Sequence, residues 1–418
     1  MTRKPPCAAP EPGLLNKSRI GLEQFTLNFK LVTPMYGGGV KAGEPDIDMP
    51  VRVSGIRGQL RFWWRLLARQ QFQSSDSLRQ EEFAVWGGVS AGEPLASKVL
   101  LRVGSAGSAK TKAWAVYESN GRGGYKGIPT PEKWANAPYA LFCAQGKQPG
   151  TDGAPPSELI QPNMTFELIV GFERLSDSQR DLVLESLRWW SQFGGLGART
   201  RRGLGAVKLE KVSVSNPQIE EKLLADITPE LANAKGFELA LVSASDERDG
   251  WTKAVKRLQE FRQGVGVGRY KKEGNRFGGS SRWPEPKAIR QLLDPSEQKP
   301  EVEYFPRAAF GLPIIFHFIK PGPADTNLNP VVAGEKLERM ASPLILRPVW
   351  SGGKWHAGAL LLPHQHLNHL KLDLSGRPVN YWPTDHPEDV ASKVPPIQEH
   401  AGTDALSAFM NFFEGKRP

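Results

Sequence analysis

Ser54-Gly-Ile-Arg-Gly-Gln-Leu-Arg-Phe-Trp-Trp-Arg-Leu-Leu-Ala-Arg69 is the stretch that decides how this chain folds. Its apolar residues recur every three or four positions, which is the spacing of one face of an α-helix. Ser54 is a typical capping residue, because a serine hydroxyl accepts hydrogen bonds from the first free N–H groups of a helix. The stretch therefore predicts a helix that begins at Ser54 and buries one face, made of Ile56, Leu60, Trp63, Trp64 and Leu67.

The same helix carries an arginine at every fourth position: Arg57, Arg61, Arg65 and Arg69. Residues at this spacing are neighbours on a helix surface, where like charges repel. Two interpretations are open. The stripe is a solvated basic face, as charged helix faces often are. Alternatively, a polyanion or carboxylates from elsewhere in the fold relieve the repulsion, and the helix N-terminus beside Arg57 adds an anion site.

Length and composition indicate a soluble globular protein. The 418 residues are enough for two or three domains, and 39% are hydrophobic and 23% charged. The net charge of +10, with a pI near 9.5, favours an acidic partner, nucleic acid first.

Targeting and redox signals favour the cytoplasm. The two cysteines, Cys7 and Cys143, form neither a disulfide framework nor a Cys-x-x-Cys zinc motif. The proline-rich start lacks the apolar core of a signal peptide. No apolar run approaches the length of about 18 residues that a membrane-spanning helix needs.

The first half of the chain predicts a strand–helix–strand–strand–helix–strand module. Strands are expected at 22–33, 98–103, 164–172 and 206–214, with a second helix from Ser178 to about Phe193. A glycine turn, Pro34-Met-Tyr-Gly-Gly-Gly39, precedes the arginine-rich helix. This order fits a ferredoxin-like βαββαβ module.

The second half is expected to repeat that architecture. A polar stretch at 215–235 is expected to be a linker, followed by a strand at 237–242 and a helix at 251–261. The long loop 264–286 carries Arg269, Lys271, Lys272, Arg276 and Arg282 among aromatic residues, and loops of this length are usually functional or disordered. Further strands are expected at 309–318, 343–349 and 355–362.

The expected fold class is therefore α+β, with two tandem ferredoxin-like (RRM-like) domains and long inserted loops. The expected domains are a flexible leader (1–20), an N-terminal domain (21–215), a C-terminal domain (236–370) and a C-terminal extension (371–418).

A second basic feature is the loop Gly194-Gly-Leu-Gly-Ala-Arg-Thr-Arg-Arg-Gly-Leu-Gly205. Glycines let backbone N–H groups approach a phosphate, and arginines supply charge-assisted contacts. The loop lacks the Gly-Lys-Ser/Thr of a Walker motif, and it follows a helix and opens a strand, the reverse of a Rossmann fingerprint. No nucleotide cofactor is predicted; the loop is either a contact for a sugar-phosphate backbone or a mobile basic loop.

The histidines do not indicate a catalytic or metal site. His364, His366 and His369 have a spacing that allows a metal ion, but neither cysteine nor a His-Glu-x-x-His motif accompanies them. The earliest histidine is His317, so both basic features lack an acid–base catalyst nearby in the sequence. We expect no catalytic residues, no metal and no cofactor.

These motifs, taken in order, resemble the RAMP superfamily of CRISPR effector subunits. The glycine loop between the second helix and the last strand is similar to the signature of that superfamily. The arginine-rich helix and three further stretches narrow the resemblance to subunits of type III-B complexes. The three stretches are Ser281-Arg-Trp-Pro-Glu-Pro-Lys-Ala-Ile-Arg290, Ala309-Phe-Gly-Leu-Pro313 and Glu338-Arg-Met-Ala-Ser-Pro-Leu-Ile-Leu346.

The resemblance implies a non-catalytic subunit that caps the filament of backbone subunits near the 3′ end of the guide RNA. Its expected partners are guide RNA, target RNA and neighbouring RAMP backbone subunits, in the cytoplasm and without a membrane. The residues at the matching positions are the expected RNA-binding set: Lys41, Arg57, Arg61, Trp64, Arg65, Gly194, Gly195, Gly197, Arg199, Arg201, Arg202, Gly203 and Gly205.

Two other functions stay open at this point. One is a metal-independent endoribonuclease of the same superfamily that processes guide precursors. The other is a purely structural capping subunit that contacts only partner proteins. Under the RNA-binding hypothesis, Arg57→Ala and a double Arg201/Arg202→Ala change weaken RNA binding and leave the fold intact.

Overall fold

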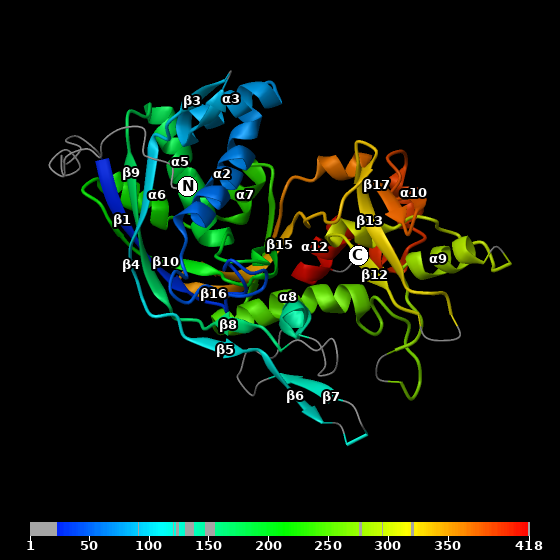
Figure 1. The fold of residues 1–418 in the computed structure, drawn as a ribbon. Coiled ribbons are helices and arrows are strands. Elements are labelled where there is room, and N and C mark those ends of the chain that lie inside the picture. The colour runs from blue at the N-terminus through cyan, green and yellow to red at the C-terminus, as the bar shows by residue number, and fades with distance from the viewer. Residues whose placement is uncertain are drawn as a thin grey trace, which may run out of the picture.

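The computed structural model has a mixed α+β fold built on antiparallel sheets (Figure 1). It describes residues 23–90, 92–119, 121–122, 125–129, 138–146, 155–275, 278–294, 296–318 and 322–416. The predicted leader, residues 1–20, lies outside this part of the chain. Within it, no helix combines the length and the apolar character that crossing a membrane requires.

The N-terminal lobe contains a four-stranded antiparallel sheet in the order β10-β1-β9-β4. Two helices, α2 (Val53–Ala68) and α5 (Asp177–Phe193), connect these strands in the predicted strand–helix–strand–strand–helix–strand sequence. The strand predicted at 98–103 is present as β4, and it occupies one edge of the sheet. The four strands are β1 (Glu23–Leu31), β4 (Val99–Ala106), β9 (Thr165–Phe172) and β10 (Val207–Ser213).

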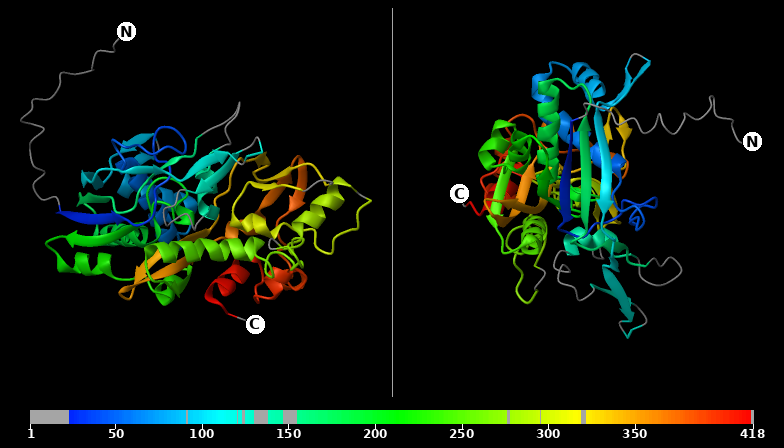
Figure 2. Two further views of the ribbon diagram at one scale, coloured as in Figure 1. Left: turned by 90° about the horizontal axis from the view of Figure 1, so that it is seen from below. Right: turned by 90° about the vertical axis from the view of Figure 1, so that its left-hand side faces the viewer.

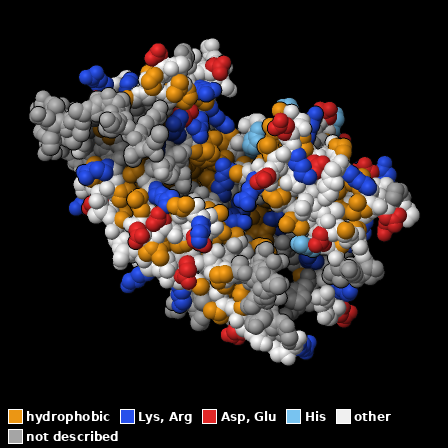
Figure 3. All heavy atoms as spheres, viewed as in Figure 1, with side chains coloured by type: hydrophobic (Ala, Val, Ile, Leu, Met, Phe, Trp, Pro, Cys, Tyr) orange, Lys and Arg blue, Asp and Glu red, His pale blue; other side chains and the backbone are white. Residues whose placement is uncertain are grey.

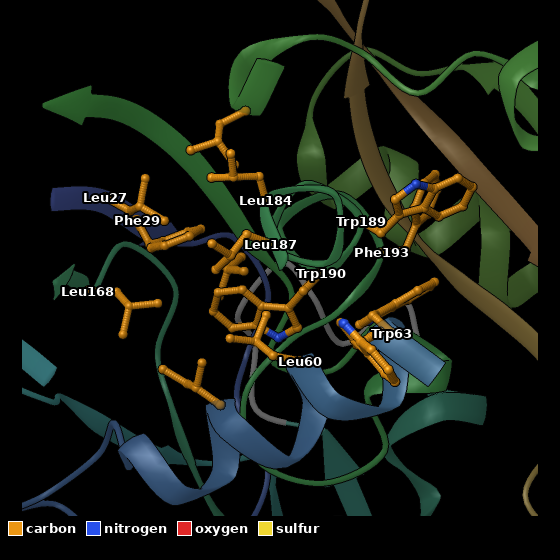
Figure 4. Packing of buried hydrophobic residues seen from close by; sticks show 14 of the residues in the cluster. Leu27, Phe29, Leu60, Trp63, Leu168, Leu184, Leu187, Trp189, Trp190 and Phe193 are labelled. Carbon is orange, nitrogen blue, oxygen red and sulfur yellow. The ribbon is translucent and has the colours of Figure 1, made fainter. Parts of the chain in front are cut away.

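Alternation along the strands builds the core of this lobe. Phe29 of β1 lies opposite Phe166 of β9, with the two rings stacked 5.1 Å apart. Trp190 of α5 meets Phe29 edge to face at the same distance, and Trp63 of α2 lies against the tilted ring of Trp189 (Figure 4). The helical spacing of these tryptophans thus buries α2 and α5 together over one face of the sheet.

Strand β4 and its surroundings are extended by short elements. The helix α3 (Ser75–Trp86) packs on α2, and a small hairpin follows it, made of β2 (Gly88–Ser90) and β3 (Glu93–Leu95). Between β4 and β9 the chain forms two further antiparallel pairs and one short helix. They are β5 (Thr111–Ala113) with β8 (Glu158–Ile160), β6 (Ala115–Ser119) with β7 (Tyr125–Pro129), and α4 (Pro138–Leu141).

The expected linker at 215–235 is instead two capped helices, so that prediction is wrong. The side chain of Asn216 caps α6 (Pro217–Leu224), and the side chain of Thr228 caps α7 (Pro229–Ala234). Each helix has proline in its first turn, where the missing N–H costs nothing. Ile219, Leu223 and Ala232 are buried in the N-terminal core, so the segment packs against the lobe.

The C-terminal half contains two more sheets. The first has the order β11-β16-β15 and comprises β11 (Glu238–Ser243), β15 (Leu344–Ser351) and β16 (Lys354–Leu361), with α8 (Glu247–Gln263) packed on it. The second comprises β12 (Ile314–Phe316), β13 (Thr326–Val332), β14 (Glu335–Lys336), β17 (Lys371–Leu374) and β18 (Arg377–Asn380). Figure 1 shows α8 running along the lower side of the view, from beneath the N-terminal lobe toward the C-terminal half, and Figure 2 shows the same helix in two further views.

The predicted C-terminal extension is part of the second core. Beyond residue 370 the chain adds β17 and β18 to a sheet and forms α10 (Pro387–Ala391), α11 (Pro395–Gln398) and α12 (Ala405–Glu414). Phe409 and Phe413 of α12 are fully buried, and Phe409 packs on Phe261 of α8 and on Phe310. A boundary at 370 would divide this core. The remaining helix of the half is α9 (Glu285–Leu293).

Candidate nucleic-acid interface

Carboxylates from the same chain neutralise part of the arginine stripe on α2. Arg61 Nε and Arg65 Nη1 each donate to Oε1 of Glu82, both at 2.6 Å. Glu82 lies on α3 and is only 4% exposed, so it is a buried acceptor shared by two cations. Of the two interpretations of the stripe, internal carboxylates therefore account for Arg61 and Arg65.

Arg57 is in a different situation. In the part of the chain that the structure describes, no hydrogen bond or ion pair involves its side chain, which is half-buried near the start of α2. No side chain caps this helix and no acidic residue stands in its first turn. The predicted cap by Ser54 is wrong, because the helix begins one residue earlier and Arg52 occupies the capping position. The carboxylate of Asp46 pairs with the Arg52 side chain and caps no N–H group of the helix, so the first N–H groups keep their partial positive charge.

Glycines keep the surface of α2 open beside Arg57. A Cβ atom placed on Gly55 or on Gly58 would have no other atom within 4 Å. Both glycines are exposed, and both lower helix propensity, so the helix gains nothing in stability from them. They leave room for a ligand to approach the backbone of the first two turns.

Gln59 ties α2 to the glycine loop 194–205. Its Nε2 donates to the carbonyl of Gly195 at 2.6 Å, and its Oε1 accepts from Gly195 N and from Trp190 Nε1. This loop also pairs with the glycine turn after β1, because Ala198 N donates to Tyr36 O at 2.8 Å. A Cβ on Gly197 would lie 2.6 Å from Tyr36 O, so the close approach of the two loops requires glycine there.

Arg199 is the exposed arginine of the glycine loop. It adopts a left-handed backbone conformation with φ of 57°, and no hydrogen bond of its guanidinium occurs within the described residues. It is close enough to Tyr36 and Cys143 for its charge to act on both. Burial still raises the pKa of each of these two groups. The start of α2, the glycine turn and Arg199 therefore lie at one connected surface.

Arg201 and Arg202 face the other way, into the C-terminal half. Arg201 donates to the carbonyl of Ser342, and Arg202 donates to the carbonyls of Leu344 at 3.0 Å and Phe310 at 2.7 Å. Burial lowers the pKa of both guanidinium groups, that of Arg202 to about 10. Their geometry is that of a contact between two parts of the protein, and it contradicts the expectation that the double substitution leaves the fold intact.

The other predicted site residues divide by burial. Trp64 is 0% exposed and packs in the core, so its predicted contact with RNA is wrong. Gly194, Gly195, Gly203 and Gly205 are also buried, where close packing or positive φ requires glycine, whereas Gly197 is exposed. Lys41 is exposed on the loop before α2, and its Nζ lies 3.7 Å from Oε2 of Glu44.

Two residues important to this arrangement were not predicted. Gln59 gave no signal, because its partners lie more than a hundred positions away in the sequence. Arg347 of β15 is fully buried and donates to the carbonyls of Gly194 and Val207. Its signal was present, since a charged residue interrupts the apolar strand Leu344–Val349.

Figure 3 shows Lys and Arg side chains gathered in the hollow between the two halves of the molecule. Arg201 bridges the two halves, because its guanidinium lies 5.5 Å from the ring centre of Phe62 on α2 and donates to the carbonyl of Ser342. His366 is near enough to Arg201 for the two charges to interact. The three histidines of the predicted cluster lie at a short 3₁₀ turn, residues 364–369, and no group of side chains that could hold a metal ion occurs among the described residues.

The model of the RAMP superfamily matches residues 28–208. The chain is similar to Cmr1 from Pyrococcus furiosus in its apo form, at 14% identity over 82% of this chain and 88% of that one, with a TM-score of 0.38. It is also similar to a chain of the type III-B Cmr-beta complex bound to cognate target RNA, at 12% identity over 90% and 98%, with a TM-score of 0.45. No curated protein matches the sequence.

The matched region contains α2 and α5, the glycine turn and the whole glycine loop. It thus includes every residue of the surface around Arg57 and Arg199. The resemblance to the RAMP superfamily that the motifs predicted is confirmed by this match. Residues 28–208 are thus similar to the RAMP superfamily.

Proposed function

We propose that this chain is a non-catalytic RNA-binding subunit of a type III-B CRISPR effector complex. It would cap the filament of backbone subunits near the 3′ end of the guide RNA, in the cytoplasm, and engage guide and target RNA. The strand order β10-β1-β9-β4 supports a ferredoxin-like N-terminal domain, and β11-α8-β15-β16 supports a second, incomplete copy.

The observation that carries the proposal is the connected surface at the start of α2. The N-terminus of α2 has no side-chain cap, and Arg57 has no side-chain partner among the described residues. Two open glycines flank Arg57, and Gln59 joins α2 to the glycine loop that carries the exposed Arg199. Such a surface suits phosphate groups, because backbone N–H groups and guanidinium groups both donate to phosphate oxygens. It offers no pattern of side chains that reads base edges, so base pairing within the guide duplex would supply sequence specificity.

The absence of histidine before His317 supports a non-catalytic role for this surface. General acid–base cleavage of RNA without a metal ion usually relies on a positioned histidine near the scissile phosphate. Tyr36, which lies at the surface, has its pKa raised by burial, which makes it a poorer base at neutral pH.

The test is a salt titration of the full chain with labelled single-stranded RNA in the presence of EDTA, with the products run on a denaturing gel. The double variant Arg57→Ala/Arg199→Ala should lower the slope of log K against log salt by about 1.4, because each phosphate contact on a single strand contributes about 0.7. The control Lys371→Ala/Lys393→Ala removes the same charge from exposed positions of the C-terminal half and should leave the slope unchanged.

Discrete cleavage in EDTA would reject the non-catalytic role and favour a guide-processing endoribonuclease. Equal slopes for the Arg57/Arg199 variant and the unmodified chain would reject this surface as the phosphate contact. No RNA binding at all, with firm co-purification of neighbouring subunits, would favour the structural capping subunit.

A further inference from the structure

A second basic surface lies in the C-terminal half, on the loop that follows α8. Four consecutive residues of this loop, Arg269, Tyr270, Lys271 and Lys272, are exposed. The surface around Arg57 does not include them, and the family match ends well before them. Two further residues of the loop, Arg276 and Phe277, lie outside the described residues.

The loop has a defined backbone structure around these residues. Tyr270 N donates to Ser280 O at 3.0 Å, and Gly279 N donates to Tyr270 O at 2.7 Å, so the two sides of the loop pair with each other. Between α8 and Tyr270, Gly266 N donates to Arg269 O at 2.7 Å and closes a tight turn. The pairing holds the backbone of Arg269 and Tyr270 against the opposite side of the loop.

The half-buried Arg282 and the buried Trp283 anchor the base of the loop. Arg282 donates to the carbonyls of Gly266 and Val267 and forms an ion pair with Glu399, at 2.9 Å through its Nη1. Trp283 is 1% exposed and donates from Nε1 to Arg262 O at 3.1 Å. The stretch that begins at Ser281, which the sequence analysis singled out, thus fixes the base of the loop.

The exposed segment combines positive charge with an accessible ring. In the described part of the chain, neither Lys271 nor Lys272 forms an ion pair, and Arg269 makes only a long bond of 3.4 Å to Gly279 O. One carboxylate, that of Glu273, follows directly in the sequence. The guanidinium of Arg282 lies 5.5 Å from the ring centre of Tyr270, yet Tyr270 remains 46% exposed.

We propose that residues 269–272 form a second RNA-binding surface, which takes an unpaired stretch of RNA. This proposal rests on the proposed function and extends it to the C-terminal half. The ring of Tyr270 stacks on an unpaired base, and Lys271 and Lys272 contact the phosphates that flank it. Base–aromatic stacking tolerates any sequence, and a base inside a duplex is not available for it.

The experiment compares five variants of the full chain, among them Arg57→Ala/Arg199→Ala, in the salt titration with a labelled single-stranded RNA and a labelled RNA duplex. Lys271→Ala/Lys272→Ala should lower the single-strand salt slope by about 1.4 and the affinity roughly tenfold at physiological salt. Tyr270→Ala should weaken single-strand binding by about fivefold or more and leave the slope unchanged, whereas Tyr270→Phe should bind like the unmodified chain. The control Lys371→Ala/Lys393→Ala should change neither quantity.

The duplex separates stacking from general charge attraction, because Tyr270→Ala should not weaken duplex binding. Equal losses for Tyr270→Ala on both RNAs, or competition by poly-glutamate as strong as by single-stranded RNA, would overturn the proposal in favour of a general polyanion surface. If Tyr270→Ala and Lys271→Ala/Lys272→Ala bind RNA like the unmodified chain and only the Arg57/Arg199 variant loses affinity, the second surface is overturned and the proposed function stands. No RNA binding by the unmodified chain would overturn both.

Discussion

The guanidinium of Arg347, in the middle of β15, donates a hydrogen bond to the carbonyl of Gly194 at the start of the glycine loop. A second bond from the same group reaches Val207 O at 2.6 Å, on the first residue of β10. Burial lowers the pKa of Arg347 to about 9, so the cation is retained at neutral pH at a desolvation cost. The glycine loop is thus held at both ends by one side chain of the C-terminal half.

Replacement of Arg347 by methionine should destabilise the fold by about 1–3 kcal/mol. The change fills the same space with an apolar chain but leaves buried carbonyls, including those of Gly194 and Val207, without donors. Urea unfolding measures the difference. The control Arg339→Met, at an exposed position, should stay within about 0.5 kcal/mol of the unmodified chain. An equally small effect at Arg347 would contradict the role of this contact.

Simultaneous replacement of Arg201 and Arg202 by alanine should lower the thermal unfolding midpoint. The change removes charge-assisted bonds to Ser342, Leu344 and Phe310, each worth about 1.5–3 kcal/mol. Arg57→Ala should leave the midpoint unchanged, because its side chain makes no such bond among the described residues. Differential scanning calorimetry measures the midpoints of the double variant, of Arg57→Ala and of the unmodified chain. If the double variant melts like the unmodified chain, the carbonyl contacts do not stabilise the contact between the glycine loop and the C-terminal half.

Local patterns in the sequence predicted the elements well, and long-range partners explain what they missed. The spacing of Leu60 and Trp63 predicted the buried face of α2, because a 3.6-residue period is a property of the helix alone. The direction of Arg202 was not predictable, since its acceptors lie more than a hundred residues further along the chain. The two helices within the segment predicted as a linker are a different kind of miss, because each has a local signal, a capping residue followed by proline at Asn216 and at Thr228.

Glu82→Gln should have opposite effects on stability and on RNA binding. The amide loses the charge that Arg61 and Arg65 share at 2.6 Å, so we expect a destabilisation of about 1–3 kcal/mol. The same change leaves two less compensated cations on α2, so affinity for single-stranded RNA should rise and its salt slope should steepen. Glu93→Gln, at an exposed position, is the control for net charge. Unchanged RNA binding would place Arg61 and Arg65 outside the interface.

Two glycine-to-alanine substitutions should change the free energy of unfolding in opposite directions. Gly205 has φ of 66°, and a Cβ there would lie 1.9 Å from Leu196 O, so Gly205→Ala should cost about 3 kcal/mol or more. Gly58 is inside α2 with open space around it, so Gly58→Ala should stabilise the chain by up to about 1 kcal/mol through helix propensity. Thermal melts of the two variants measure both. A stable Gly205 variant would contradict the packing of the glycine loop.

The stability of the chain should fall on acidification, partly through His400. The ring of His400 packs against Phe412 at 4.9 Å and Phe261 at 5.8 Å, and its Nε2 is buried without a hydrogen-bond partner. Burial lowers the pKa of His400 below 6.5, an effect that Arg282 strengthens and Glu399 opposes. As the pH falls through the ordinary histidine range, the unfolded chain therefore binds the proton first, and the free energy of unfolding decreases.

His400→Phe removes this titration and keeps an aromatic ring in place. The variant should lose less stability than the unmodified chain between about pH 8 and about pH 5.5, and the urea midpoint at each pH measures the loss. His369→Gln, at an exposed position, should follow the unmodified chain. An equal acid sensitivity of the His400 variant would show that His400 does not contribute, and would leave His356 and His366, whose pKa values burial also lowers, as the sources of the dependence.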